Sequence, residues 1–262
     1  MNAVIAYGTG RGTTAKVAAA VAEGMKAAGV KAVSVRIEYL TPARITGAEI
    51  FGVGSPVHFY REARYMTNFL STLPRLDGKR GFVFCTCGMN RPGETLQRLH
   101  GALAQRGASV VGAASFRSAM SYLPLRQRGL GNGDELPDSS VFDAAREFGA
   151  RLANSDAQPP IGAPTVPLLT RLKARLLADM RFRQLIFPGV RLNVPKCTGY
   201  GSCLSRCLLN GLERNEGETV PYLKDTCVHC LECIAWCPRA AIEVDSQIKE
   251  WLSTLSYRLG IH

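Results

Sequence analysis

The chain has 262 residues, of which 46% are hydrophobic and 20% charged, so it is long enough for two domains and too apolar to be wholly disordered. A formal charge of +11 would suit a protein that binds nucleic acid. However, the sequence contains no zinc-finger spacing, RNA-binding aromatic motif or Lys/Arg block that would support such binding. No segment is apolar enough to cross a bilayer and no cleavable leader opens the chain, so we expect a cytoplasmic protein.

Strand-like and helix-like segments alternate through the first half of the chain. Short apolar runs predict strands at 4–7, 33–37, 50–53, 82–85 and 108–116. Apolar periodicity predicts helices around 17–25 and over 95–105 and 140–152. This order is typical of a doubly wound α/β domain with a parallel sheet, which we expect over residues 1–153.

The loop between the first predicted strand and the first predicted helix has the composition of an anion site. Its glycines expose backbone amides in front of a helix N-terminus, where a phosphate binds readily. The spacing matches neither the Lys-containing P-loop nor the dinucleotide fingerprint. The residues that we expect to hold a phosphate are Thr9, Gly10, Arg11, Gly12, Thr13 and Thr14.

Two further loops follow predicted strands, at 52–60 and 86–91. Open parallel sheets bind ligands at the carboxyl ends of their strands, where both loops lie. The ligand-binding residues expected here are Ser55, Pro56, Val57, His58, Phe59 and Tyr60 in the first loop, and Thr86, Cys87, Gly88 and Met89 in the second. The aromatic residues would equally suit a core. We expect Cys85 to be a buried strand residue. Cys87 could be a reactive thiol beside the ligand, but an inert small side chain is preferred.

Taken together, these loops resemble those of the flavodoxin-like superfamily. The first loop, Tyr-Gly-Thr-x-x-Gly-Thr-Thr-x-Lys-Val-Ala from position 7, is similar to that of menaquinone-linked protoporphyrinogen dehydrogenases. The resemblance implies FMN as a cofactor, with its phosphate in the first loop and its ring between the other two.

Residues 154–190 are expected to connect the first domain to the last. The first half contains Pro159, Pro160, Pro164 and Pro167, and a basic helix is expected over 168–187. This helix could be a connector with a solvated charged face, or a docking surface for an acidic partner or a membrane interface, so peripheral membrane contact stays open. The last domain is expected over 191–262, closing with an amphipathic helix at 247–259.

Seven of the nine cysteines fall between positions 197 and 237. Cys227, Cys230, Cys233 and Cys237, followed by Pro238, match C-x2-C-x2-C-x3-C-P. In this motif three thiolates on a tight loop bind three irons of one cubane, while the fourth leaves toward the other cluster. Zinc sites pair their cysteines in twos, so the spacing indicates iron and sulfur.

An incomplete copy of the motif lies upstream. Cys197, Cys203 and Cys207 occupy its first, third and fourth positions, while Tyr200 stands at the second and Leu208 replaces the proline. Ligand exchange between the motifs then gives one complete 4Fe-4S site. Its ligands would be Cys207, Cys227, Cys230 and Cys233, which leaves Cys197, Cys203 and Cys237 for the other cluster.

The three-cysteine site has three interpretations. Three thiolates suit a 3Fe-4S cluster, which we expect. A degenerate or empty site is an alternative, and so is a 4Fe-4S cluster with water or the Tyr200 phenolate as fourth ligand.

The cysteine pattern resembles two-cluster bacterial ferredoxins, and its departure at position 200 is like that of some seven-iron ferredoxins. The whole chain resembles a flavodoxin-ferredoxin fusion family, which implies FMN, one 4Fe-4S cluster and a second cluster as cofactors. We expect electron transfer between clusters and FMN and on to a redox partner. Residues 1–153 carry 19 Lys and Arg against 11 Asp and Glu, which favours an acidic ferredoxin or enzyme.

The alternative is an FMN-dependent oxidoreductase that acts on a quinone, tetrapyrrole or enoyl substrate, with the clusters as electron relay. No acid-base pair that would mark a catalytic site stands out in the sequence.

Overall fold

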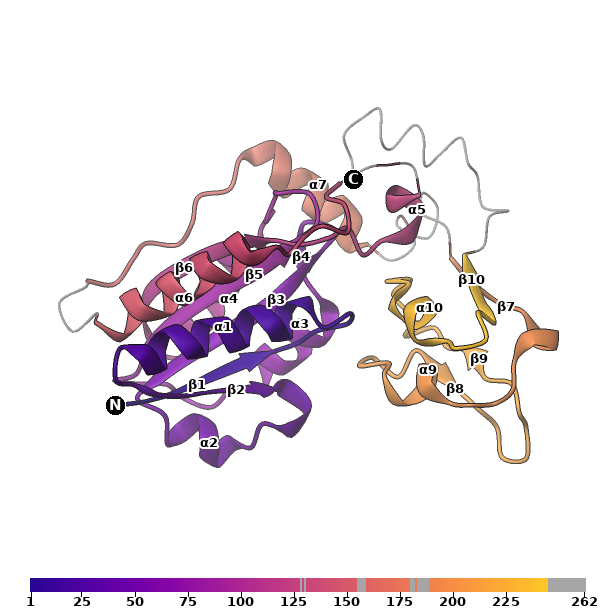
Figure 1. The fold of residues 1–262 in the computed structure, drawn as a ribbon, viewed down its shortest axis with the longest axis horizontal. Coiled ribbons are helices and arrows are strands. Elements are labelled where there is room, and N and C mark those ends of the chain that lie inside the picture. Colours follow the sequence, from indigo (N-terminus) through magenta and orange to yellow (C-terminus); the bar gives the residue numbers. More distant parts are fainter. Residues whose placement is uncertain (128, 130, 155–158, 180–181, 183–188, 245–262) are drawn as a thin grey trace. The chain divides into compact units, whose positions relative to one another are not determined.

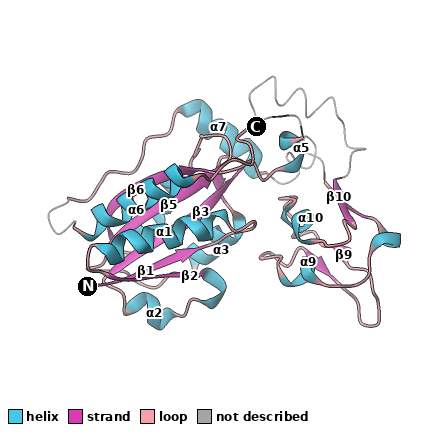
Figure 2. Ribbon diagram, viewed as in Figure 1, coloured by secondary structure: helices cyan, strands magenta, loops and turns pink. Residues whose placement is uncertain are grey.

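The computed structural model of the chain describes residues 1–127, 129, 131–154, 159–179, 182 and 189–244. These residues fold into two compact units, which are shown in Figures 1 and 2. The first unit comprises residues 1–120 and 131–171, and the second comprises residues 121–130 and those from 172 onward. The C-terminal helix expected at 247–259 lies outside the described residues.

A parallel sheet forms the centre of the first unit. Its strands are β1 (Asn2–Tyr7), β2 (Lys31–Arg36), β3 (Ile50–His58), β5 (Arg80–Cys87) and β6 (Ser109–Arg117), in the spatial order β2-β1-β3-β5-β6. The short strand β4 (Arg61–Glu62) pairs antiparallel with the end of β3. This order is the flavodoxin-like one, in which the chain switches direction of winding between β1 and β3.

Helices cover both faces of this sheet (Figure 1). The helices α1 (Thr13–Ala27) and α6 (Ser139–Ala153) pack together over one face, where their apolar side chains meet Phe82 and Phe84. Helix α4 (Thr95–Gln105) lies on the opposite face of the sheet. Its Leu103 side chain packs close to Gly81 of β5. The doubly wound α/β fold expected from the sequence is therefore confirmed for this unit.

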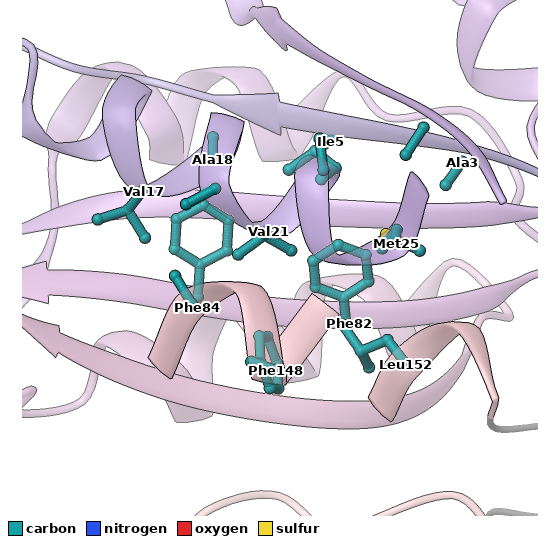
Figure 3. Packing of buried hydrophobic residues seen from close by; sticks show 14 of the residues in the cluster. Ala3, Ile5, Val17, Ala18, Val21, Met25, Phe82, Phe84, Phe148 and Leu152 are labelled. Carbon is teal, nitrogen blue, oxygen red and sulfur yellow. The ribbon is translucent and has the colours of Figure 1, made fainter. Parts of the chain in front are cut away.

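Rings from β5 and α6 fill the core between sheet and helices (Figure 3). The Phe82 and Phe148 rings meet edge to face with centroids 5.9 Å apart, and Phe116 joins them 6.1 Å from Phe148. Phe82 and Phe84 lie against Gly52 and Gly54 of β3, where any Cβ atom would collide with the rings. The two glycines thus make room for the aromatic core.

The observed bounds of several strands differ from those expected, most of all at the end of β3. β3 was expected to end at Val53, but it continues to His58 because residues up to Pro56 pair with β5 and the rest pair with β4. Three short helices were not predicted, because no side chain caps them. They are α2 (Pro42–Thr46), α3 (Arg64–Ser71) and α5 (Leu123–Arg126).

The second unit contains short elements around the cysteines. Strand β7 (Val190–Leu192) pairs antiparallel with β10 (Ile242–Val244), and β8 (Leu212–Glu213) pairs with β9 (Tyr222–Leu223). The helices within the cysteine motifs are α9 (Ser202–Ser205) and α10 (Glu232–Trp236), and a 3-10 turn at Val194–Lys196 precedes them. The expected basic helix is present as α7 (Leu168–Ala178), and most of its predicted remainder up to 187 lies outside the described residues.

Candidate functional sites

The loop after β1 leads into an uncapped helix N-terminus. Gly12 adopts the left-handed conformation, with φ 92°, and its amide donates to Thr9 Oγ1 at 3.0 Å. No side chain caps α1, so the amides of its first turn keep their hydrogen-bonding capacity at the positive end of the helix dipole. An anion held there would receive several backbone hydrogen bonds.

The three threonines of this loop have different partners. The Thr14 side chain is buried and its hydroxyl shares a 2.9 Å hydrogen bond with the hydroxyl of Thr86 on β5. Thr9 accepts from Gly12, which leaves the Thr9 proton available. Thr13 is half-buried, and its hydroxyl has no hydrogen bond among the described residues. Thr9 and Thr13 can therefore donate to an anion, whereas Thr14 ties the loop to β5.

The loop packs closely against α3. A Cβ atom on Gly8 would lie 2.5 Å from Tyr65 Cε2 and 2.6 Å from Met66 Sδ. A larger residue at this position would require the Tyr65 and Met66 side chains to move.

The loop at 52–60, which was expected to flank the cofactor ring, forms a hairpin between β3 and β4. Phe59 and Tyr60 form its turn in left-handed conformations, with φ 50° and 66°. The Ser55 side chain is fully buried, where its hydroxyl donates to the Pro56 carbonyl at 2.8 Å and accepts from the Ala63 amide at 3.2 Å. Ser55 therefore shapes the hairpin.

The accessible part of this hairpin is its outer end. The residues Pro56, Val57, His58 and Phe59 are half-buried, while Tyr60 is buried. The His58 ring meets the Tyr65 ring edge to face, with centroids 6.2 Å apart. These side chains can line a flat ligand placed beside β3.

The second expected ring loop begins at the end of β5. Thr86 and Cys87 are buried strand residues, whereas Gly88 and Met89 are half-buried. Gly88 lies against the Met120 backbone, which leaves no space for a larger residue. Cys85 is a buried strand residue, as expected.

Cys87 is a buried thiol whose pKa depends on its neighbours in the fold. A hydrogen bond from Cys85 lowers the pKa of Cys87, and the backbone amides of Arg91 and Asn90 add to this effect. The same contact with Cys87, together with burial, raises the pKa of Cys85 well above its usual range. No feature of the linear sequence placed these amides near the thiol.

The three loops meet at one edge of the sheet. β1, β3 and β5 are neighbours, and the phosphate loop, the hairpin and the Cys87 loop follow their carboxyl ends. This edge includes the switch point of the sheet, where such folds bind ligands.

The two cysteine motifs of the second unit have the same backbone conformation. Left-handed residues recur at matching places 30 positions apart: Gly199 and His229, Gly201 and Leu231, and Asn210 and Ala240. In both motifs the third cysteine lies on a one-turn helix, α9 or α10. The cysteine spacing predicted that the motif occurs twice, but it did not predict that the left-handed positions recur as well.

The fourth cysteine of each motif accepts a hydrogen bond from a backbone amide. Gly211 donates to Cys207 Sγ at 3.1 Å, and Ala241 donates to Cys237 Sγ at 3.2 Å. Amide hydrogen bonds to the sulfur suit a cysteine that binds a metal cluster.

Contacts between the motifs bring each fourth cysteine to the other motif. Gly211, which bonds Cys207, lies against the Cys227 backbone, so that a Cβ there would be 3.0 Å from Cys227 Cα. On the other side, Ser202 beside Cys203 donates to the Trp236 carbonyl at 2.7 Å. The Trp236 ring carries the Arg206 guanidinium at 4.1 Å.

Cys197, Cys203 and Cys237 line one small cavity of about 30 Å³, together with Tyr200 and apolar residues such as Leu192 and Ile242. Tyr200 is 75% exposed, so most of its side chain faces outward.

Burial acts on the thiols of the second motif. It raises the pKa of Cys233 to about 12 and that of Cys230 well above its usual range. These thiols would be protonated at neutral pH unless a metal compensated the buried negative charge. Within the described ranges, no group of three or more His, Cys, Asp or Glu residues converges on a single metal ion. A cubane needs no such convergence, because each of its cysteines binds a different iron.

Comparisons with known proteins address the first unit. Residues 4–122 match the family model for the flavodoxin domain. No curated protein sequence matches the chain. Both cysteine motifs lie outside the matched residues.

The chain is also similar to solved structures, among them two flavodoxins and one oxidoreductase. A flavodoxin from the domain Archaea is 18% identical, with 59% of this chain and 98% of that chain covered and a TM-score of 0.46. Flavodoxin 1 from Bacillus cereus is 16% identical, with 59% and 98% covered and a TM-score of 0.47. The rubredoxin oxygen:oxidoreductase from Desulfovibrio gigas is 19% identical, with 59% and 35% covered and a TM-score of 0.47.

Proposed function

We propose that this flavodoxin-like chain is an electron-transfer protein that carries FMN in its first unit and two iron-sulfur clusters in its second. FMN exchanges two electrons and each cluster exchanges one, so the protein would convert between one-electron and two-electron carriers. The observation that carries the proposal is the pairing of seven cysteines on a repeated backbone with a flavodoxin-like sheet in the same chain.

In the first unit, the chain would bind the FMN phosphate through the first-turn amides of α1 and the hydroxyls of Thr9 and Thr13. Gly10, Arg11 and Gly12 complete this loop, and the uncapped helix N-terminus supports the assignment. The hairpin at Pro56–Tyr60 and the loop after Cys87 would flank the ring. The match of residues 4–122 to the flavodoxin family model supports FMN as the ligand.

In the second unit, Cys207, Cys227, Cys230 and Cys233 would bind a 4Fe-4S cluster. The contact of Gly211 with Cys227 supports the inclusion of Cys207 in this set. Cys197, Cys203 and Cys237 would bind a 3Fe-4S cluster, as their shared cavity supports. The outward exposure of Tyr200 favours three thiolates over a phenolate ligand.

The electron acceptor or donor would be an acidic redox protein. The excess of Lys and Arg in residues 1–153, 19 against 11 acidic residues, would attract it over long range. Electron transfer to an acidic ferredoxin should then slow as salt concentration rises, because salt screens this attraction.

The decisive experiment is a count of flavin, iron and sulfide in anaerobically prepared protein, combined with EPR. We expect one FMN and about seven irons per chain, with the oxidised-state signal of a 3Fe-4S cluster. Tyr200→Cys should raise the iron content to about eight and remove that signal, because it supplies the missing thiolate.

Tyr222→Cys is the matched control, since Tyr222 is also an exposed tyrosine of the second unit but lies outside both motifs. It should leave the iron content unchanged. Eight irons in the unmodified protein, or equal iron contents in both variants, would contradict the ligand assignment.

A further inference from the structure

Helix α7 exposes four leucines on one side. Leu168, Leu169, Leu172 and Leu176 are 73%, 64%, 49% and 48% exposed, whereas Ala174 and Leu177 of the same helix are buried. With 3.6 residues per turn, the four leucines lie within an arc of about 100°. Elsewhere in the described ranges, the large exposed apolar residues occur singly along the chain. A concentration of exposed leucines on one helix marks an interaction surface.

Basic residues border this leucine arc. Arg171, Lys173 and Arg175 lie on α7, and residues 168–178 include no Asp or Glu. By helical geometry, Arg175 stands beside one edge of the arc, with Arg171 beyond it, and Lys173 stands beside the other edge. Arg171 and Arg175 are exposed and Lys173 is half-buried.

We propose that α7 binds an anionic lipid surface and lies in the plane of that surface. The leucines would enter the boundary between headgroups and acyl chains, while the cations on both edges would contact lipid phosphates. The charge of the helix argues for this occupant, because three cations and no anion complement anionic headgroups. Among the residues that the structure describes, no helix is long and apolar enough to span a membrane, so contact would be peripheral.

The inference does not depend on the redox proposal. Vesicle binding can be measured without electron transfer, and flavin and iron contents are measured separately. Absence of clusters would defeat the proposed function and leave membrane binding untouched, while absence of vesicle binding would do the reverse.

The test is cosedimentation of the full-length, cofactor-loaded protein with lipid vesicles. We expect binding to phosphatidylcholine vesicles that contain about one third phosphatidylglycerol, and at least about tenfold weaker binding to phosphatidylcholine alone. Binding to the anionic vesicles should weaken as salt rises. Failure to bind anionic vesicles at low salt would overturn the proposal.

Two double variants separate the leucines from the charges. Leu172→Asp with Leu176→Asp should weaken binding at least about 30-fold, because the apolar contact is lost. Arg171→Gln with Arg175→Gln should weaken binding to anionic vesicles about 25-fold, since each cation near such a surface contributes roughly fivefold. Flavin content, iron content and thermal unfolding should be unchanged in both variants, which shows that the fold is intact.

The matched control is Val33→Asp with Tyr39→Asp, which places the same charges at exposed apolar residues of the first unit. This control should bind vesicles like the unmodified protein. An equal loss in the control would show that added negative charge alone weakens binding, and would overturn the role of α7. Size-exclusion chromatography adds a second check: a dimer that the leucine variant converts to a monomer would identify a second copy of the chain as the occupant of the leucine arc, against our proposal.

Discussion

In the first unit, Phe82, Phe84 and Phe148 stand at the centre of an apolar core enclosed by the sheet, α1 and α6. In residues 189–244 the buried apolar side chains are few, and none of them is aromatic. They are Val190, Leu212, Val228, Leu231, Ala241 and Ile242. The seven cysteines of this segment are half-buried around them.

This difference teaches how each unit is stabilised. The first unit buries enough apolar surface to fold as other α/β domains do. The second has short strands and one-turn helices whose burial is too small to order the chain alone, so we infer that bound clusters supply what an apolar core lacks. The amide-to-sulfur hydrogen bonds at Cys207 and Cys237 fit this role.

Removal of iron should lower the stability of the second unit far more than that of the first. Oxidation in the presence of a chelator should unfold residues 189–244 and leave the first unit folded, because we assign the clusters to the second unit alone. Limited proteolysis with mass spectrometry of the fragments measures this. Equal protection of residues 189–244 with and without iron would show that the second unit is self-sufficient.

A cavity in the apolar core should destabilise the first unit and leave the iron content of the second unchanged. The Phe84 side chain is fully buried, so Phe84→Ala should lower the free energy of unfolding of the first unit by about 3–5 kcal/mol. Urea denaturation followed by circular dichroism measures the change, and iron per folded chain should stay constant. Tyr39→Ala, at a residue of the first unit that is 73% exposed, is the control and should change stability by about 0.5 kcal/mol or less.

Two adjacent threonines separate ligand binding from stability within the first unit. Thr13→Val should weaken FMN binding about tenfold or more, since it removes a hydroxyl that we assign to the phosphate. Thr14→Val should instead cost about 1–2 kcal/mol of stability, because it leaves the buried Thr86 hydroxyl without its partner. Flavin fluorescence titration and urea denaturation distinguish the two effects. Equal losses of FMN in both variants would contradict the assignment.

The smallest effect concerns backbone strain in the second unit. Ala240 is exposed and left-handed, with φ 47°, so Ala240→Gly should stabilise this unit by about 1 kcal/mol. Ala235→Gly, on the exposed side of α10, should destabilise it by up to about 1 kcal/mol, since glycine is a poor helix former. The urea concentration at which iron is released reports both changes. A shift of the same sign in both variants would mean that the left-handed position is not strained.

The sequence predicted the alternating α/β pattern of the first unit because its strands are continuous apolar runs with glycine-rich ends. α4 was predicted with its observed bounds, since Leu99 and Leu103 recur with helical spacing. α3 was missed, because its buried residues Tyr65, Met66 and Leu70 occupy a single short stretch without a capping residue.

The candidate sites were foreseeable only in part. Glycines and hydroxyls in the first loop indicated an anion site, because those residue types are needed wherever amides face a phosphate. The separate roles of Thr13 and Thr14 depend on Thr86, which lies 72 positions beyond Thr14 and reaches it through the sheet. The influence of Cys85, Asn90 and Arg91 on the Cys87 pKa likewise requires the folded loop.

The 30-residue repeat of the second unit has an evolutionary consequence. A segment whose backbone is encoded twice can accept a substitution in one copy while the other copy retains every ligand. Position 200 is such a place: tyrosine occupies it, and the left-handed glycines on either side keep the loop shape that its counterpart at Cys230 has. Under the ligand assignment that we propose, a single codon change there would alter the number of irons in the chain while the backbone persists.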